Sequence, residues 1–237
     1  MPLSQSDGVA ANWLLKALPP EDYQRLQPHL EWVSLSLYQV IYEANDVIRY
    51  VYFPTGAMIS LVSTLMDGST IEVGITGHQG MAGLPVVLGG TIGSHRALVQ
   101  VAGEAIRLKA TVLQAEFDKG DSLQKILLRY VQILLAQTSQ AVACNRFHTT
   151  EERLARWLLL VADAVSSDEF LLTQEFISQM VGVRRAGVTV AAGNLAQLGL
   201  IRHTRGKIEI VNRLGLEDFS CECYGVISNE LSRMLRQ

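Results

Sequence analysis

The chain is poor in the features that mark secreted and membrane proteins. It has only three cysteines in 237 residues, and none precedes Cys144. An odd number of cysteines without scaffold spacing excludes a disulfide-stapled secreted domain and favours a reducing compartment. The most apolar short run, residues 157–162, is too short to span a bilayer. The first sixteen residues lack a basic start and a continuous apolar segment, so we expect no signal peptide, no membrane contact and a cytoplasmic location.

Catalytic and metal-binding motifs are also missing. There is no P-loop, no Ser-His-Asp signature and no HExxH. Cys221-x-Cys223 with His203 would supply three ligands where a structural zinc normally needs four, so we expect ordinary thiols and no metal. The sequence therefore predicts a protein that is not an enzyme, and it identifies no cofactor. The histidines are scattered and make no metal constellation by their spacing: His29, His78, His95, His148 and His203.

The net charge of −3 does not by itself indicate a nucleic-acid partner, but its distribution is uneven. Residues 173–213 carry six cations against Glu175 and Glu209, a local balance of +4. A basic segment in an otherwise acidic chain provides a local positive surface that can attract a polyanion. Charge alone is equally compatible with a solvated basic surface. The six cations are Arg184, Arg185, Arg202, Arg205, Lys207 and Arg213.

The composition of residues 31–110 predicts a series of short strands. They are rich in Val, Ile, Tyr and Thr, and turn signals interrupt them at short intervals. Asp67-Gly68 between two apolar runs predicts a hairpin. Strands at this spacing favour a small antiparallel sandwich or barrel, with the first thirty residues as a short helical cover.

A long helix is expected from about Asp121, and it carries two apolar stripes. One stripe is enough to pack on the chain's own strands, so the other is predicted to face a second copy of the chain. The alternative is a helix buried deeply in its own subunit. The predicted dimer stripe consists of Leu128, Val131, Leu135, Thr138 and Val142. The other stripe consists of Leu123, Leu127, Tyr130, Leu134 and Ala141. In the helix that follows, Glu152 and Arg156 have the spacing of an i,i+4 ion pair.

Residues 173–199 have helix–turn–helix spacing. Thr173 is a helix cap, Gly182 suits the turn, and a second helix runs from about residue 183 to Gln197 before Gly199. Residues 200–211 read as two short strands around Arg205-Gly206, which predicts a hairpin wing.

Two adjacent arginines open the second helix, where an isolated helix would prefer negative charge. In a helix that enters the major groove, Arg184 and Arg185 would lie at base edges or phosphates. Gly187 and Thr189 would let the helix approach the duplex, and Arg202, Arg205 and Lys207 of the wing would hold the backbone. The alternative is a surface pair, or partners for acidic side chains.

These segments resemble the Crp/Fnr superfamily of bacterial transcription regulators over essentially the whole chain. The most specific stretches are "TQEFISQMVGVRR" and "FPTGAMISLVSTLMDGSTIEVGITGHQGMAG". The resemblance implies an α+β fold with a cupin-like antiparallel β-roll, a long dimerisation helix and a C-terminal winged helix–turn–helix. The expected domains are residues 1–120, 121–146 and 147–237. In the family an Arg at the position of Arg185 reads a base edge, but the usual following Glu is Ala186 here and a further Arg is replaced by Val190. We therefore expect the recognition helix to dock on DNA as in the family, but to read a different target sequence.

The effector pocket is where the chain departs from the family's cyclic-nucleotide sensors. Those sensors hold ribose with a Glu soon after a glycine, whereas Gly83 here is followed by Leu84 and Pro85. They hold phosphate with an Arg before Ser or Thr, whereas Arg96 precedes Ala97. Thr138-Ser139 resembles the adenine-contacting pair. We expect cyclic AMP not to be the effector, and the effector, if there is one, is unidentified.

The resulting expectation is a homodimeric regulator that reads double-stranded DNA. RNA polymerase and a small molecule are further candidate partners. The alternative is a small-molecule sensor whose C-terminal domain contacts proteins instead of DNA. Only the first function predicts a steep salt dependence of DNA binding.

Overall fold

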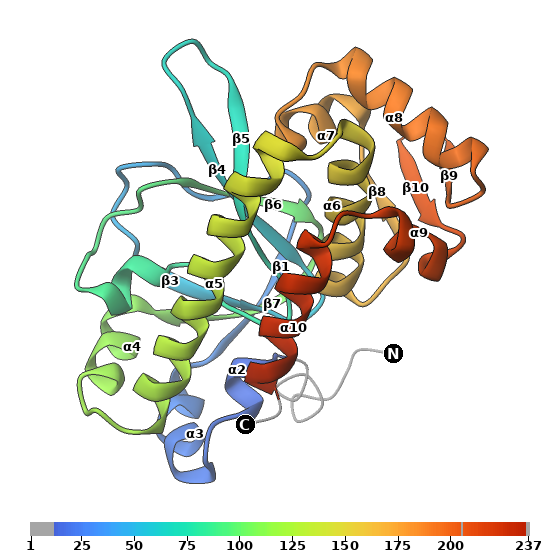
Figure 1. The fold of residues 1–237 in the computed structure, drawn as a ribbon. Helices are drawn as coiled ribbons and strands as arrows, with labels where there is room; N and C mark the ends of the chain where they lie inside the picture. Colours follow the sequence, from blue (N-terminus) through green and yellow to red (C-terminus); the bar gives the residue numbers. More distant parts are fainter. Residues whose placement is uncertain (1–11, 205, 236–237) are drawn as a thin grey trace. The chain divides into compact units, whose positions relative to one another are not determined.

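The computed structural model describes residues 12–204 and 206–235, and it divides into two compact units (Figure 1). The first unit comprises residues up to 61 together with 76–132. The second comprises residues 62–75 together with 133–237. The division falls inside the long helix α5 (Ser122–Phe147) and inside strand β4.

The first unit is built on antiparallel sheets. One sheet of this unit has the order β1-β7-β3. A four-stranded sheet has the order β2-β6-β4-β5, and nearly all of its last strand, β5, belongs to the second unit. Val51 and Phe53 of β3 are fully buried and alternate with half-buried tyrosines, which is the period of a strand with one face on the core. The strands are β1 (Glu31–Leu35), β2 (Val40–Tyr42), β3 (Tyr50–Pro54), β4 (Met58–Thr64), β5 (Thr70–Thr76), β6 (Arg96–Val101) and β7 (Gly103–Lys109).

Short helices accompany these sheets. They are α2 (Trp13–Lys16), α3 (Pro20–Leu26), η1 (Gln27–His29), η2 (Leu84–Leu88) and α4 (Ala110–Phe117). The helical cover expected in the first thirty residues is present from residue 13 onward, and residues 1–11 lie outside the described part. The predicted Asp67-Gly68 hairpin is confirmed, with Gly68 at a φ of +83° between β4 and β5. In the part of the chain that is described, no helix is both long enough and apolar enough to cross a bilayer.

The second unit contains the C-terminal helices and a small sheet of order β8-β10-β9. Its elements are α6 (Thr150–Val165), β8 (Glu169–Leu171), α7 (Gln174–Val181), α8 (Arg185–Gln197), β9 (Ile201–Thr204), β10 (Lys207–Ile210), α9 (Arg213–Phe219) and α10 (Cys223–Leu235). β8, α9 and α10 had no counterpart in the sequence prediction. The fold class expected from the sequence is confirmed.

One sequence prediction about α6 is wrong. Glu152 does not pair with Arg156, because the Glu152 carboxylate accepts hydrogen bonds from the backbone N–H and hydroxyl of Thr149 at 2.8 Å each. This capping box satisfies donors at the start of α6. Arg156 is buried instead, with an exposed fraction of 8%. An i,i+4 spacing thus gave the wrong partner because a helix cap competed for the same carboxylate.

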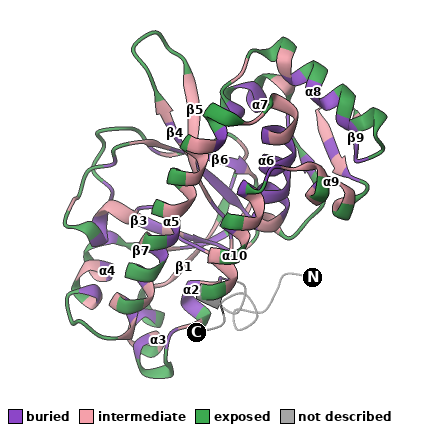
Figure 2. Cartoon of the chain, viewed as in Figure 1, coloured by how far each residue is buried: buried purple, intermediate pink, exposed green. Residues whose placement is uncertain are grey.

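The long helix α5 has one buried and one open side. Leu123, Leu127 and Tyr130, which belong to the stripe predicted to pack on the chain's own strands, are buried. On the stripe predicted to face a second copy, Leu135 is 64% and Val142 is 68% exposed. Leu128 and Thr138 are also exposed and Val131 is half-buried. The alternative of a helix buried all round therefore does not apply within the protomer, and Figure 2 shows exposed residues recurring along α5.

Candidate nucleic-acid interface

The helix–turn–helix begins and turns at the expected residues. The Thr173 side chain accepts a hydrogen bond from the Phe176 N–H at 3.2 Å, which caps α7. Gly182 ends α7 with a φ of +68°, a left-handed conformation that favours glycine. A Cβ on Gly182 would also lie 2.7 Å from Ile71 Cδ1, so the Ile71 side chain would have to shift to admit any other residue there.

Helix α8 buries one face and leaves the other open. Val188, Ala191, Ala192 and Leu195 form its buried face. The small side chains of Ala191 and Ala192 let α8 lie close to α6 and α7. Figure 2 shows exposed residues along the outer side of α8. Asn194 donates a hydrogen bond to Glu151 of α6 at 2.9 Å, which fixes the far end of α8.

Arg184 and Arg185 lie at the start of this helix. Arg184 is the N-cap residue in an extended conformation, and Arg185 is the first helical residue. Both are exposed, and neither forms an ion pair with any residue that the structure describes. The alternative of arginines engaged by acidic side chains thus finds no support in the described residues. Two guanidinium groups with free donors at a helix N-terminus are suited to base edges or phosphates.

Gly187 and Thr189 flank Val188 of the buried face, on opposite sides of it. A Cβ on Gly187 would meet nothing within 4 Å, so no contact inside the protomer requires glycine there. Thr189 is exposed, and its hydroxyl is 3.1 Å from both the Gln174 side chain and the Arg185 carbonyl. Thr189 therefore ties the first residue of α7 to the first turn of α8.

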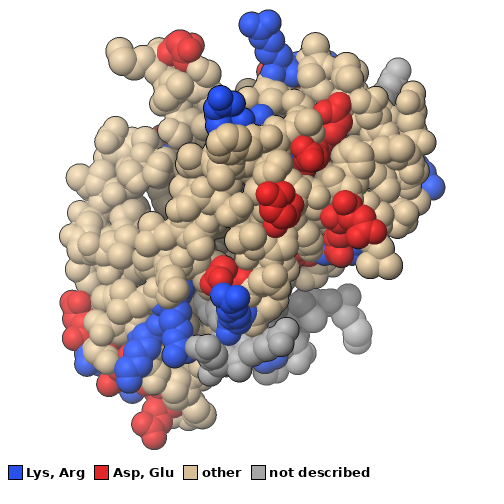
Figure 3. All heavy atoms as spheres, viewed as in Figure 1, with Lys and Arg blue, Asp and Glu red and all other residues tan. Residues whose placement is uncertain are grey.

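The wing differs from the helix because its described cations are paired. Arg202 on β9 bonds Glu209 on β10 at 2.6 Å, and Lys207 bonds Glu169 on β8 at 2.5 Å. Exposed pairs of this kind contribute only about 0–1 kcal/mol, so a phosphate can replace the carboxylate. Arg205, which we also expected in the wing, lies outside the described residues. On the face drawn in Figure 3 the cations are scattered among acidic side chains and do not form one continuous patch.

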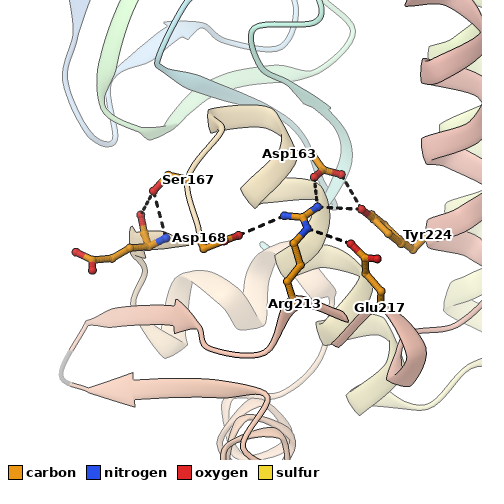
Figure 4. A network of polar contacts seen from close by, with 7 residues as sticks. Asp163, Ser167, Asp168, Arg213, Glu217 and Tyr224 are labelled. Carbon is orange, nitrogen blue, oxygen red and sulfur yellow. Dashed lines mark hydrogen bonds and ion pairs between the residues drawn. The ribbon is translucent and has the colours of Figure 1, made fainter. Parts of the chain in front are cut away.

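Arg213, the last cation of the basic segment, has a structural role. Its guanidinium bonds Asp163 of α6, Glu217 of α9 at 3.0 Å and the Tyr224 hydroxyl of α10 at 3.1 Å (Figure 4). It also reaches Asp168 at 3.3 Å. Burial alone would lower the pKa of Arg213. The hydrogen bond and the negative charge of Asp163 raise this pKa by more, so the net shift is upward. This residue belongs to the scaffold of the domain.

The predicted effector residues have ordinary local surroundings. The Arg96 guanidinium bonds both carboxylate oxygens of Glu43, at 2.7–3.1 Å. Ala97 is fully buried, and Leu84 begins the short helix η2 after Gly83. In the second unit Thr138 donates to the Val73 carbonyl at 3.3 Å, and Ser139 is exposed. No carboxylate follows Gly83 where the family's ribose acceptor would be.

The comparisons agree with this geometry. The family model for the Crp-like helix-turn-helix domain matches residues 152–219. Residues 152–219 form a Crp-like helix–turn–helix domain. No curated protein matches the chain in sequence.

Solved structures extend the likeness beyond the Crp-like domain. FixK2 from Bradyrhizobium japonicum is 19% identical with a TM-score of 0.68, over 81% of this chain and 98% of its own. TTHB099, a CRP-family transcriptional regulator from Thermus thermophilus, is 17% identical with a TM-score of 0.66, over 79% and 96%. The c-di-GMP responsive global regulator CLP from Xanthomonas campestris is 14% identical with a TM-score of 0.63, over 81% and 99%. The chain thus has the fold of Crp/Fnr-type transcription regulators, with a helix–turn–helix DNA-binding domain.

Proposed function

We propose that the chain is a homodimeric, sequence-specific DNA-binding transcription regulator of Crp/Fnr type. The observation that carries this proposal is the pair Arg184 and Arg185, exposed at the start of α8 and without a carboxylate partner among the described residues. The first turn of a recognition helix is the part that meets base edges in the major groove. Such a protein is not an enzyme, acts in the cytoplasm and works with RNA polymerase as its protein partner.

The open stripe of α5 supports the dimer. Leu128, Leu135 and Val142 are large apolar side chains left exposed on one side of a 26-residue helix. Exposed apolar side chains that repeat every seven residues along one side of a helix are suited to pack against a second helix. Two copies related by a two-fold axis along α5 would present two recognition helices to half-sites about 10 base pairs apart.

The paired Arg96 supports a regulator that does not respond to cyclic AMP. A phosphate entering at Arg96 would have to displace a bidentate contact with Glu43, and the ribose would find no carboxylate after Gly83. Buried ribose hydroxyls without an acceptor would cost about 1–3 kcal/mol each. CLP, which is described as a c-di-GMP responsive regulator, has a similar fold, so the fold itself does not require cyclic AMP.

Cyclic AMP at millimolar concentration should therefore leave the melting temperature of the protein within about 1 °C of its starting value. A ligand at a hundred times its Kd would instead add about 2.7 kcal/mol and raise the melting temperature by several degrees. The measurement is thermal unfolding with and without the nucleotide. A clear upward shift that Arg96→Ala abolishes would contradict this part of the proposal.

The DNA-reading roles are tested by a salt titration of two variants on a selected palindrome and a scrambled duplex. Arg185→Ala should weaken binding to the palindrome by about 1–3 kcal/mol and relax base discrimination at one position in each half-site. Lys207→Ala should weaken binding to both duplexes alike. It should also reduce the slope of log affinity against log salt concentration by about one unit. If Arg185→Ala weakens binding to both duplexes equally while folding and dimerisation persist, Arg185 contacts a phosphate and the proposal that it reads a base is wrong. If the wild-type protein shows no salt-dependent binding to either duplex, the result favours the alternative function, a small-molecule sensor whose C-terminal domain contacts proteins.

A further inference from the structure

Four metal-ligating side chains that are far apart in the sequence meet within the second unit. Cys144 is in the last turn of α5, and His148 follows one turn later, just beyond the end of the helix. Cys221 precedes α10, and Cys223 is its first residue. One ligand atom from each of the four lies within 4.8 Å of all the others. His203, the histidine considered with Cys221 and Cys223 from the sequence, lies on β9 instead.

The spacing of the ligand atoms matches a tetrahedral site. The Sγ atoms of Cys144 and Cys221 are 3.5 Å apart, and Cys223 Sγ is 3.5 Å from His148 Nδ1. Zinc–sulfur bonds of about 2.3 Å and zinc–nitrogen bonds of about 2.0 Å place tetrahedral ligands roughly 3.5–3.8 Å apart. All four ligand atoms lie within 4.8 Å of one another, so the cluster would have to close by no more than about 1 Å around an ion. All three thiols are free and buried, so none is lost to a disulfide.

The surroundings of the ligands also fit a metal centre. His148 faces Cys223 with Nδ1, and its Nε2 lies 3.2 Å from the carboxylate of Glu222. A histidine that gives its second N–H to a carboxylate is held in the tautomer that leaves the other nitrogen free for a metal. The Gln140 side chain donates to Cys223 Sγ at 3.1 Å, which would stabilise a thiolate.

Two buried arginines supply positive charge beside the thiols. Arg153 and Arg156 are 9% and 8% exposed, and the Nε atom of each has no hydrogen-bond partner among the described residues. Three thiolates and one Zn²⁺ carry a net charge of −1, which these guanidinium groups would offset. The charge of Arg156 acts on Cys144, and the charge of Arg153 acts on both Cys144 and Cys221. A cluster of plain buried thiols would need neither cation.

We propose that Cys144, His148, Cys221 and Cys223 bind one Zn²⁺ ion in a closed tetrahedral site. Three thiolates and one imidazole leave no open position, which is the arrangement of structural rather than catalytic zinc. The soft ligand set selects against magnesium and calcium. The ion would join the end of α5 to the start of α10, two segments that are distant in the sequence, and its binding free energy would become folding free energy of the second unit.

The test uses the full-length protein purified under reducing conditions. One equivalent of zinc per protomer should be released by a mercurial thiol reagent, and the metal-free protein should melt more than about 10 °C lower. Cobalt(II) added to the metal-free protein should give the visible bands of a tetrahedral complex with thiolate charge-transfer bands, saturating at one equivalent. Cys144→Ser and Cys223→Ser should lose this spectrum, whereas His203→Ala on the wing should keep it.

A second variant covers the case in which the cysteine variants fail to fold. Glu222 is 75% exposed, so Glu222→Gln should fold, keep all four ligands and weaken metal affinity by about 10–100-fold. The proposal is overturned if reduced, folded protein binds less than a tenth of an equivalent of zinc or gives no tetrahedral cobalt spectrum. It is equally overturned if the isolated protein carries an iron–sulfur chromophore, or if mild oxidation joins Cys144 to Cys221 with the same rate whether or not zinc is present.

Discussion

Leu135→Glu should convert the protein from a dimer to a monomer at micromolar concentration without unfolding it. Leu135 is 64% exposed in the protomer, so a glutamate there costs the single chain little. In a dimer joined along the open stripe of α5, the two copies would bury two unpaired carboxylates. Each would cost at least about 2 kcal/mol, which raises the dimer Kd by at least about a thousandfold. Sedimentation velocity measures the change, and binding to the full palindrome should fall to the level of a half-site.

The matched control is Arg129→Glu, six residues earlier on α5. Arg129 is exposed, and a glutamate there places the same carboxylate about 120° around the helix from Leu135, away from the stripe of Leu128, Leu135 and Val142. This variant should sediment and bind DNA like the wild-type protein. A Leu135→Glu variant that stays dimeric, or a wild-type protein that is already monomeric, would show that the open stripe of α5 is not the interface.

Arg213→Met should destabilise the second unit by about 2–4 kcal/mol, because it leaves Asp163 and Tyr224 without the charge that joins them. The arginine links α6, α9 and α10, so its loss affects three helices at once (Figure 4). The value lies below that of a fully buried pair, because the Arg213 side chain is 35% exposed. We expect the melting transition of this unit to fall by about 5–12 °C, with faster amide exchange in α9 and α10.

Arg233→Met separates this effect from a general loss of surface charge. Arg233 forms one i,i+3 pair with Glu230 at 2.6 Å, and its side chain is 72% exposed. Its removal should change stability by less than about 0.5 kcal/mol. Equal shifts in both variants would contradict a special role for the Arg213 network. Arg213→Lys should fall between the wild type and Arg213→Met, because an ammonium keeps the charge but cannot bond four groups in one plane.

The parts of the fold that depend on local chemistry were predictable from the sequence. Thr173 caps α7 through its own side chain, and Gly182 takes the left-handed conformation that ends it. Asp67-Gly68 likewise closes the β4–β5 hairpin. Each of these signals acts over three or four residues, so no knowledge of tertiary contacts is needed to interpret it.

The parts that depend on distant residues were not predictable in this way. The cysteine cluster needs α10 to return to the end of α5, and nothing near Cys221 encodes that return. Arg156 was paired with Glu152 from its spacing, whereas packing buries it beside Cys144. One missed contact did have a signal. Arg202 and Glu209 stand directly opposite each other across the wing, so the register of the hairpin around Gly206 could have paired them.

The pairing in the wing also has a consequence for how the protein finds its site. In the proposed DNA complex, Arg202 and Lys207 would each have to leave a carboxylate to reach a phosphate, and that carboxylate would then face the DNA. Backbone contacts from the wing would thereby be weakened on every sequence alike. The base contacts proposed for Arg184 and Arg185 carry no such penalty, because these arginines leave no described carboxylate behind. The protein would therefore leave the wrong sequence quickly and spend less of its search time held on the rest of the genome.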